Sequence, residues 1–319
     1  MEKVSGMILV FGSINVDLVA RVDRIARPGE TVLSPGYELF YGGKGANQAV
    51  AAARSAPAGS GVFMCGAIGE DAFGEGCRAN LAAEGIDLAW LQVVGAPTGS
   101  AFIAVDAAGE NAITVASGAN RLLDAGRLGE ESLDRIRLAV LQMEVPLSEN
   151  LALARRLKPR EAAVILNFAP ARDDLPKDAL LELLRATDYL VVNEHEAATA
   201  CRALGLPEDD CLGLSAFLGV PVIVTLGARG VELHRPGQEA WHCEAAKIEV
   251  VDTTGAGDTF VGVLASGLDG GLGIEAAIRR AAHAASLSCT KLGAQGAMPK
   301  LSDLAAAQNA DLPASAPAN

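Results

Sequence analysis

Short, continuous apolar runs recur along the chain and alternate with longer stretches of helical character. A strand that is apolar along its whole length is buried on both faces, which is typical of a parallel sheet covered by helices. The predicted strands are 7–12, 61–69, 138–144, 162–169, 188–193 and 220–227. The predicted helices are 45–55, 73–85, 148–158, 194–204, 209–218, 256–268 and 274–291. This alternation predicts a three-layer α/β/α fold around a doubly wound, mostly parallel sheet.

Two segments, 13–42 and 98–118, break the alternation of strands and helices. The first contains alternating apolar residues, and the second has the pattern of a hairpin that turns at AAGEN. We expect them to form a small antiparallel β-sheet lid beside the core, or a dimer surface, because a lone small sheet leaves one face uncovered. The small polar residues and prolines of 308–319 predict a disordered tail. The core then consists of 1–12, 43–97 and 119–307.

The composition excludes two classes of partner. The 319 residues carry a formal charge of −13, from 26 Lys and Arg against 39 Asp and Glu, so the basic face that nucleic acids require is not expected. The chain has no apolar run of about 20 residues, so no membrane span is expected. Its six cysteines lack a CxxC pair or metal-ligand spacing, which indicates free thiols in a reducing cytoplasm. Any phosphate must therefore be held by local backbone amides and a few cations.

The most informative glycine cluster lies where the helix 256–268 begins. Gly255, Ala256 and Gly257 leave backbone N–H groups accessible at the positive end of that helix, which is suited to an anion hole around a phosphoryl group. Asp258 follows in the first turn. A carboxylate there also suits the helix dipole alone. Beside an anion hole, however, it is placed to accept the proton of a hydroxyl that attacks a γ-phosphate.

A second glycine cluster, Gly42 to Asn47, precedes the helix 45–55. It is compatible with a simple tight turn, but Lys44, Asn47 and Gln48 gather in the first helical turn, where a polyhydroxylated or anionic ligand would be bound well. The cluster is not a Walker A loop, because Gly45 follows Lys44 where that loop has Ser or Thr.

Polar side chains also follow several predicted strands. Asn15 and Asp17 share one face by alternation, which suits either two neighbouring sugar hydroxyls or a local turn. Glu144 ends another strand and is either a surface group or a ligand for a further hydroxyl. Asn193 and Glu196 fit a helix capping box, and their oxygens also suit a hydrated Mg²⁺ carried by a nucleotide.

The motifs together resemble those of the ribokinase-like (PfkB) carbohydrate kinase family. They are GSINVD, PGETV, GGKGANQAVAAAR, QMEVP, NFAPAR, VNEHEA, TLGARGV, VDTTGAGDTFVG and KLGAQGAMP, in the family's order from about Ile8 to Pro299. The resemblance implies a ribokinase-like fold and ATP-dependent phosphorylation of D-ribose to D-ribose 5-phosphate. It also implies Mg²⁺ with ATP, a monovalent cation such as K⁺, and a homodimer formed through the lid.

The resemblance also assigns roles to single residues. Asp258 matches the catalytic base, with the amides of Gly255, Ala256 and Gly257 as the anion hole. The positions that match the family's sugar ligands are Asn15, Asp17, Gly43, Lys44, Asn47, Glu144 and Asp258. Those that match its nucleotide site are Asn193, Thr225, Gly227, Ala228, Arg229, Gly230, Gly257 and His283. Glu196 matches a residue that affects Mg²⁺, and the monovalent cation positions are Asp252, Thr254, Ser288, Lys291, Gly293 and Ala297.

Other functions remain compatible with the motifs. A related kinase acting on 2-deoxyribose, fructose or a nucleoside would share them, although a nucleoside site needs more aromatic lining than three Tyr, two Trp and eight Phe offer. A catalytically silent sugar-binding regulator is the alternative from another class. It would have no use for a carboxylate beside an anion hole.

Overall fold

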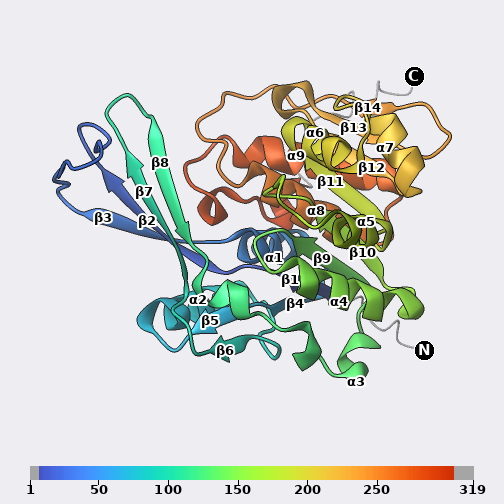
Figure 1. Cartoon of the computed structure of the whole chain (residues 1–319), viewed down its shortest axis with the longest axis horizontal. Coiled ribbons are helices and arrows are strands. Elements are labelled where there is room, and N and C mark those ends of the chain that lie inside the picture. Colours follow the sequence, from blue (N-terminus) through green and yellow to red (C-terminus); the bar gives the residue numbers. More distant parts are fainter. Residues whose placement is uncertain (1–6, 305–319) are drawn as a thin grey trace, which may run out of the picture.

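The computed structural model describes residues 7–304 and has an eight-stranded sheet at its centre (Figure 1). The six strands from β4 to β12 are parallel, and β13 and β14 extend that edge antiparallel. In spatial order the strands are β14 (Trp241–Cys243), β13 (Val231–His234), β12 (Val222–Thr225), β11 (Tyr189–Asn193), β10 (Ala163–Asn167), β9 (Leu138–Gln142), β1 (Met7–Phe11) and β4 (Gly61–Cys65). The predicted doubly wound, mostly parallel sheet is confirmed.

Helices cover both faces of this sheet and bury two apolar clusters against it. One face is covered by α1 (Lys44–Ser55), α2 (Ala72–Ala83), α8 (Ala256–Asp269) and α9 (Ile274–Ser288). The other is covered by α4 (Leu147–Leu157), α5 (Lys177–Arg185), α6 (Glu194–Leu204) and α7 (Cys211–Leu218), with the short α3 (Glu130–Leu133) beside them. The seven predicted helices are confirmed. The helix α5 is not among the predicted elements, although its buried Leu180, Leu183 and Leu184 have helical spacing.

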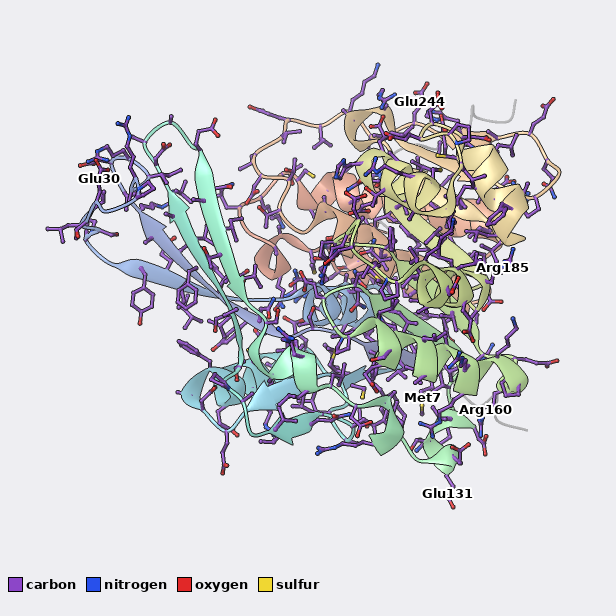
Figure 2. The ribbon with its side chains drawn as sticks, viewed as in Figure 1. Met7, Glu30, Glu131, Arg160, Arg185 and Glu244 are labelled. Carbon is purple, nitrogen blue, oxygen red and sulfur yellow. The ribbon has the colours of Figure 1, made fainter. Side chains whose placement is uncertain are left out.

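The two irregular segments form a separate four-stranded sheet, which extends away from the core (Figure 1). Its strands are β3 (Tyr37–Gly42), β2 (Asn15–Arg21), β7 (Gly99–Val105) and β8 (Asn111–Ala116). The prediction of an antiparallel sheet is wrong in one pairing: β2 and β7 run parallel, because each leaves the core at the same end and points the same way. Side chains project from both faces of this sheet into solvent (Figure 2).

Other details differ from the predicted elements. The run 61–69 divides into β4 and a short β5 (Ala67–Gly69), which pairs with β6 (Gln92–Val94) in its own sheet. The predicted disordered tail, 308–319, lies outside the described residues. Within 7–304, none of the helices combines the length and apolarity that crossing a bilayer would require.

The topology brings the sequence motifs to one edge of the central sheet. The parallel strands β1, β9, β10, β11 and β12 all end there, so the residues that follow them share that edge. Ligands of open α/β sheets bind at this edge. The amino-terminal ends of α1 and α8 lie against each other nearby, because the two helices pack together along their length.

Candidate active site

The beginning of α8 depends on glycine. Gly255 has φ of 75°, and a Cβ there would lie 2.9 Å from the Cβ of Ala294, so a side chain would be both strained and crowded. The next turn closes normally, with the Thr259 amide donating to Gly255 O at 2.8 Å. A Cβ at Gly257, by contrast, would have open space around it. The helix therefore begins at an open, unobstructed surface.

The amides of this turn differ in availability. The Ala256 amide donates to Thr253 O at 3.2 Å. Within residues 7–304 the amides of Gly257 and Asp258 have no backbone acceptor. Of the three amides expected to form an anion hole, that of Gly257 is available in this arrangement and that of Ala256 is engaged. The Asp258 amide is a further donor at the same helix end.

The Asp258 carboxylate is held on both sides by amides from α1. Asn47 Nδ2 donates to its Oδ2 at 2.9 Å, and Gln48 Nε2 donates to its Oδ1 at 3.0 Å. The Gln48 amide also donates to Asn167 Oδ1 at 3.0 Å. Asp258 is only 7% exposed, so a carboxylate needs such partners there. The carboxylate is thus fixed in orientation at the edge of a pocket.

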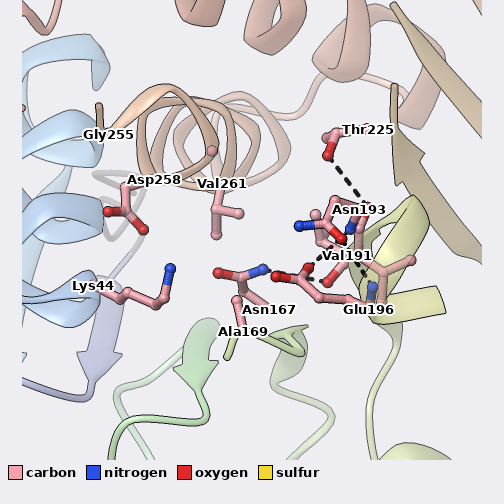
Figure 3. A pocket seen from close by; sticks show the side chains of 12 residues that line it. Lys44, Asn167, Ala169, Val191, Asn193, Glu196, Thr225, Gly255, Asp258 and Val261 are labelled. Atoms are coloured by element: carbon pink, nitrogen blue, oxygen red, sulfur yellow. Dashed lines mark hydrogen bonds between the residues drawn. The ribbon is translucent and has the colours of Figure 1, made fainter. Parts of the chain in front are cut away.

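Lys44 extends into this pocket between Asp258 and Asn167 (Figure 3). Burial disfavours its charge, but the carboxylates of Asp258, Glu144 and Glu196 outweigh burial, and the pKa of Lys44 is raised. The ammonium group is therefore charged at neutral pH. A cation that faces a buried carboxylate across a pocket is suited to an anionic ligand between or beside them.

The predicted sugar ligands converge beside Asp258. Glu144 Oε2 accepts from Ser13 Oγ at 2.5 Å and from the Lys44 amide at 3.0 Å. Asp17 is close to two carboxylates: burial, followed by the charges of Glu144 and Asp258, raises its pKa to about 6. Such mutual proximity of carboxylates is characteristic of a functional site.

Asn15 and Gly43 join the small sheet to the core at this point. Asn15 Oδ1 accepts from Asn120 Nδ2 at 2.7 Å. Gly43 has φ of 90°, and a Cβ there would lie 2.8 Å from the Asn15 backbone nitrogen. Together with Asn47 on α1, the structure therefore brings all seven predicted sugar-site positions to one region.

Asn193 and Glu196 form the capping box that their spacing predicts. Asn193 Oδ1 accepts from the Glu196 amide, and Glu196 Oε2 accepts from the Asn193 amide, each at 2.8 Å. Both residues also line the pocket with Lys44 and Asp258 (Figure 3). Burial raises the pKa of Glu196, partly offset by the hydrogen bond from Asn193 and the charge of Lys44. The structural and the ligand-binding interpretations therefore remain compatible.

The other predicted nucleotide residues are less concentrated. Thr225 lines the pocket, and its hydroxyl donates to Val192 O at 3.3 Å. The exposed 3-10 turn Gly227–Arg229, which includes Ala228, follows it and ends at Gly230, whose φ is 95°. Arg229 forms an ion pair with Glu194. His283 on α9 lies outside the residues that line this pocket, so the pocket does not include every predicted position.

The predicted monovalent cation positions lie in two loops that Asp252 ties together. Its Oδ1 accepts from the Thr254 amide at 2.9 Å and from the Thr254 hydroxyl at 2.6 Å, and its Oδ2 accepts from the Gly293 amide at 2.8 Å. Ser288 Oγ donates within α9, to Ala285 O. Lys291 is exposed and Ala297 is buried.

Several polar contacts of the site were not expected from the sequence. Gln48 contacts Asp258 because α1 and α8 cross closely, which Gly262 permits: a Cβ there would lie 2.5 Å from Gln48 O. Asn120 contacts Asn15, and Gln295 Nε2 donates to Asn47 Oδ1 at 3.0 Å. Small residues on both α1 and α8 were the available signal for the first of these contacts.

Comparison with known proteins agrees with this geometry. The model of the pfkB family of carbohydrate kinases matches residues 5–301. The ribokinase of Lactococcus lactis subsp. lactis is 41% identical over 308 residues, covering 96% of this chain and 97% of that protein. The crystal structure of a Thermotoga maritima ribokinase has a TM-score of 0.86 at 34% identity, over 95% of this chain and 99% of that chain.

A structure of Arabidopsis thaliana ribokinase complexed with ribose and ATP has a TM-score of 0.84 at 30% identity, and the match covers 95% of this chain and 98% of that chain. The resemblance indicated by the motifs is confirmed over nearly the whole length. The chain therefore belongs to the pfkB family of carbohydrate kinases.

Proposed function

We propose that this kinase transfers the γ-phosphoryl group of ATP to the 5-hydroxyl of D-ribose. The observation that carries the proposal is the buried Asp258 carboxylate at the start of α8, beside the unobstructed Gly257 amide. The similarity to ribokinases, one of them complexed with ribose and ATP, supports this choice of sugar and nucleotide.

In this proposal Asp258 accepts the proton of the 5-hydroxyl as its oxygen attacks the γ-phosphorus. The new O–P bond forms as the bond to the β,γ-bridging oxygen breaks, and ADP and D-ribose 5-phosphate are released. The amides of Gly257 and Asp258, with Lys44 across the pocket, stabilise the charge on the transferring group. The Gly255 amide would stabilise the same charge. The Ala256 amide would also do so once its hydrogen bond to Thr253 O opens.

The sugar would be oriented by the polar groups beside the base. Asn15, Asp17 and Glu144 supply acceptors for hydroxyl groups, and Asn47 supplies an amide. Lys44 and the backbone at Gly43 complete the set. Burial of Asp17 next to Glu144 and Asp258 supports this role, because sugar hydroxyls would satisfy carboxylates that otherwise lie close together.

The nucleotide would extend along the strand ends beyond α8. Asn193 and Thr225 would face its phosphates, and the turn at 227–230 and His283 would line the rest. Mg²⁺ bound to ATP supplies positive charge that offsets the phosphate charge. Glu196 suits a hydrated cation, because its carboxylate lines the pocket with one oxygen, Oε2, held by the Asn193 amide.

We further propose a monovalent cation, K⁺, between the loops that Asp252 joins. The hydrogen bonds that Asp252 accepts from Thr254 and Gly293 support this, because they hold the two loops in a defined relation next to α8. The remaining positions are Ser288, Lys291 and Ala297. An increase of kcat on replacing Na⁺ by K⁺ is the expected result, and equal rates in the two salts would contradict it.

A homodimer in the cytoplasm completes the proposal. The small sheet supports dimerisation, because it exposes large apolar side chains that a second copy would cover. They are Tyr37, Leu39, Phe40, Phe102, Ile113 and Val115. Sedimentation velocity tests this, and a monomer at micromolar concentration would contradict it. The six cysteines are free thiols, which suits a reducing compartment.

An ATP-coupled assay on ribose, 2-deoxyribose, fructose and adenosine tests the main proposal, with and without K⁺. The highest kcat/KM is expected on ribose. A higher value on 2-deoxyribose or another substrate would reassign the acceptor. Sugar binding by calorimetry without turnover on any of the four would favour a binding protein instead.

A further inference from the structure

A line of side-chain amides leads from α2 through the loop after α9 to the Asp258 carboxylate. Asn80 Nδ2 donates to Gln295 Oε1 at 2.7 Å. Gln295 Nε2 donates to Asn47 Oδ1 at 3.0 Å. Asn47 Nδ2 donates to Asp258 Oδ2 at 2.9 Å. Four residues from four segments are thus joined end to end by three hydrogen bonds.

The chemistry at one end sets the direction of every bond in this line. An ionised carboxylate only accepts hydrogen bonds, so Asn47 must present its amide nitrogen to Asp258. Its carbonyl oxygen then points the other way and needs a donor, which is Gln295 Nε2. The Gln295 carbonyl in turn needs a donor, which is Asn80 Nδ2. Without Gln295, the Asn47 side chain is free to turn its amide oxygen toward the Asp258 carboxylate, and the two oxygens then repel each other.

Gln295 itself is firmly anchored. It is 9% exposed and lies in the 3-10 turn Gln295–Ala297. Arg54, from the last turn of α1, donates to the backbone oxygens of Gln295 and Met298. Arg54 is also paired with Glu84 through two hydrogen bonds. The loop that carries Gln295 is therefore fixed to the same helix that carries Asn47.

We propose that Gln295 is a positioning residue for Asp258, acting through Asn47. It holds the Asn47 amide in the orientation that keeps one carboxylate oxygen in place, while Gln48 holds the other. The proposal rests on the proposed function in one respect, the role of Asp258 as the base. A side chain that merely filled space would have no need of donors and acceptors matched along the whole line.

The first experiment compares two buried glutamines. Gln295→Met keeps the side-chain length and removes the two hydrogen bonds of the line that Gln295 makes, with Asn80 and with Asn47. The change releases Asn47 from the orientation that lets it donate to the charged Asp258 carboxylate, and loss of one such bond corresponds to roughly tenfold, so kcat on ribose is expected to fall about tenfold. The matched control is Gln92→Met, which removes two hydrogen bonds with the Asp124 backbone and none of the hydrogen bonds of this line. It is expected to lower stability and leave kcat unchanged.

The second experiment asks whether Gln295 acts through Asn47. In an Asn47→Ala background the Gln295→Met change should have no further effect on kcat, whereas independent effects would multiply. A multiplied loss in the double variant, or an unchanged kcat in Gln295→Met alone, would overturn the proposal. Asn80→Ala provides a milder variant if Gln295→Met does not fold, with an expected loss of about two- to threefold that also vanishes without Asn47.

Asp258→Asn separates this proposal from the proposed function. If that variant retains the turnover of the unaltered enzyme, the base role fails. If Asp258 is required and Gln295 is dispensable, only the positioning role fails.

Discussion

The strands of the central sheet and those of the small sheet are covered in different ways. β9 is buried at all five of its residues, whereas every residue of β8 is exposed. Asp258 belongs to the covered part, since it lies in the first turn of α8, whose following residues are buried against α1 and α9. Asp17 belongs to the exposed small sheet and lies at the site because it is close to the beginning of β2.

The difference indicates how the two halves of the site are prepared. On the α8 side, the hydrogen-bond partners of the Asp258 carboxylate are already in position, so the proposed base is preorganised within a packed core. On the small-sheet side, large apolar side chains such as Phe40 and Ile113 are exposed, and Asp17 is only partly buried. Changes on the α8 side should therefore alter chemistry, and changes at the small sheet should alter binding and stability.

The largest effect is expected from Asp258→Asn. The substitution keeps the shape of the side chain and removes its ability to accept a proton, so kcat should fall by ~10²-fold or more. Sugar affinity, measured by calorimetry, should be largely retained. Turnover near that of the unaltered enzyme would show that the core half of the site does not supply the base.

The next effect is expected from Gly257→Val. Because an added Cβ at Gly257 would have open space around it, the valine side chain should extend into the space proposed for the phosphoryl group. The kcat value should fall about 10- to 100-fold with little change in melting temperature. Gly129→Val, at another glycine with open space and an ordinary φ of −67°, is the control. Equal kcat in both variants would argue against stabilisation by these amides.

The sequence predicts the local features of the site better than the contacts between distant residues. The start of α8 and the place of Asp258 follow from local signals, three small residues and a helix period, and both are found as expected. The sequence places Gln48 near a ligand but does not predict its contact with Asp258, and it does not assign Gln295 or Asn120 to the site. The contacts of these three residues join positions more than a hundred residues apart. Only the packing of complete helices and strands brings such pairs together.

The small sheet shows a second limit of sequence patterns. Alternation of apolar residues predicts strands but carries no information on the direction of a neighbour, so the parallel pairing of β2 and β7 was missed. The short strands β13 and β14 lie at the sheet edge and give little apolar signal.

A smaller effect is expected from Asn120→Ala, at the junction of the two halves. Asn120 is 1% exposed, accepts from the Ile14 amide at 2.9 Å, and donates to Ile14 O at 3.1 Å and to Asn15 Oδ1 at 2.7 Å. Loss of these hydrogen bonds should raise KM for the sugar about tenfold and change kcat little, because Ile14 and Asn15 at the beginning of β2 are no longer held in place. Ser215→Ala, which removes buried hydrogen bonds far from the site, should affect stability alone. An unchanged KM in Asn120→Ala would separate the junction from sugar binding.

A last effect concerns stability and not turnover, and its size depends on pH. The pKa of Asp17 is raised from 3.8 to about 6, mainly by burial and then by Glu144 and Asp258. The folded chain therefore retains a proton that the unfolded chain loses between about pH 4 and 6, and stability decreases across that interval. Above about pH 6 the full cost remains, so Asp17→Asn should raise the free energy of unfolding by about 2 kcal/mol after allowing for solvent screening. The gain should shrink toward pH 4. Urea denaturation at several pH values measures it, with Asp23→Asn as a control that removes the same charge from an exposed position. A gain that is equal at all pH values, or shared by the control, would place its cause in overall charge and not in the burial of Asp17.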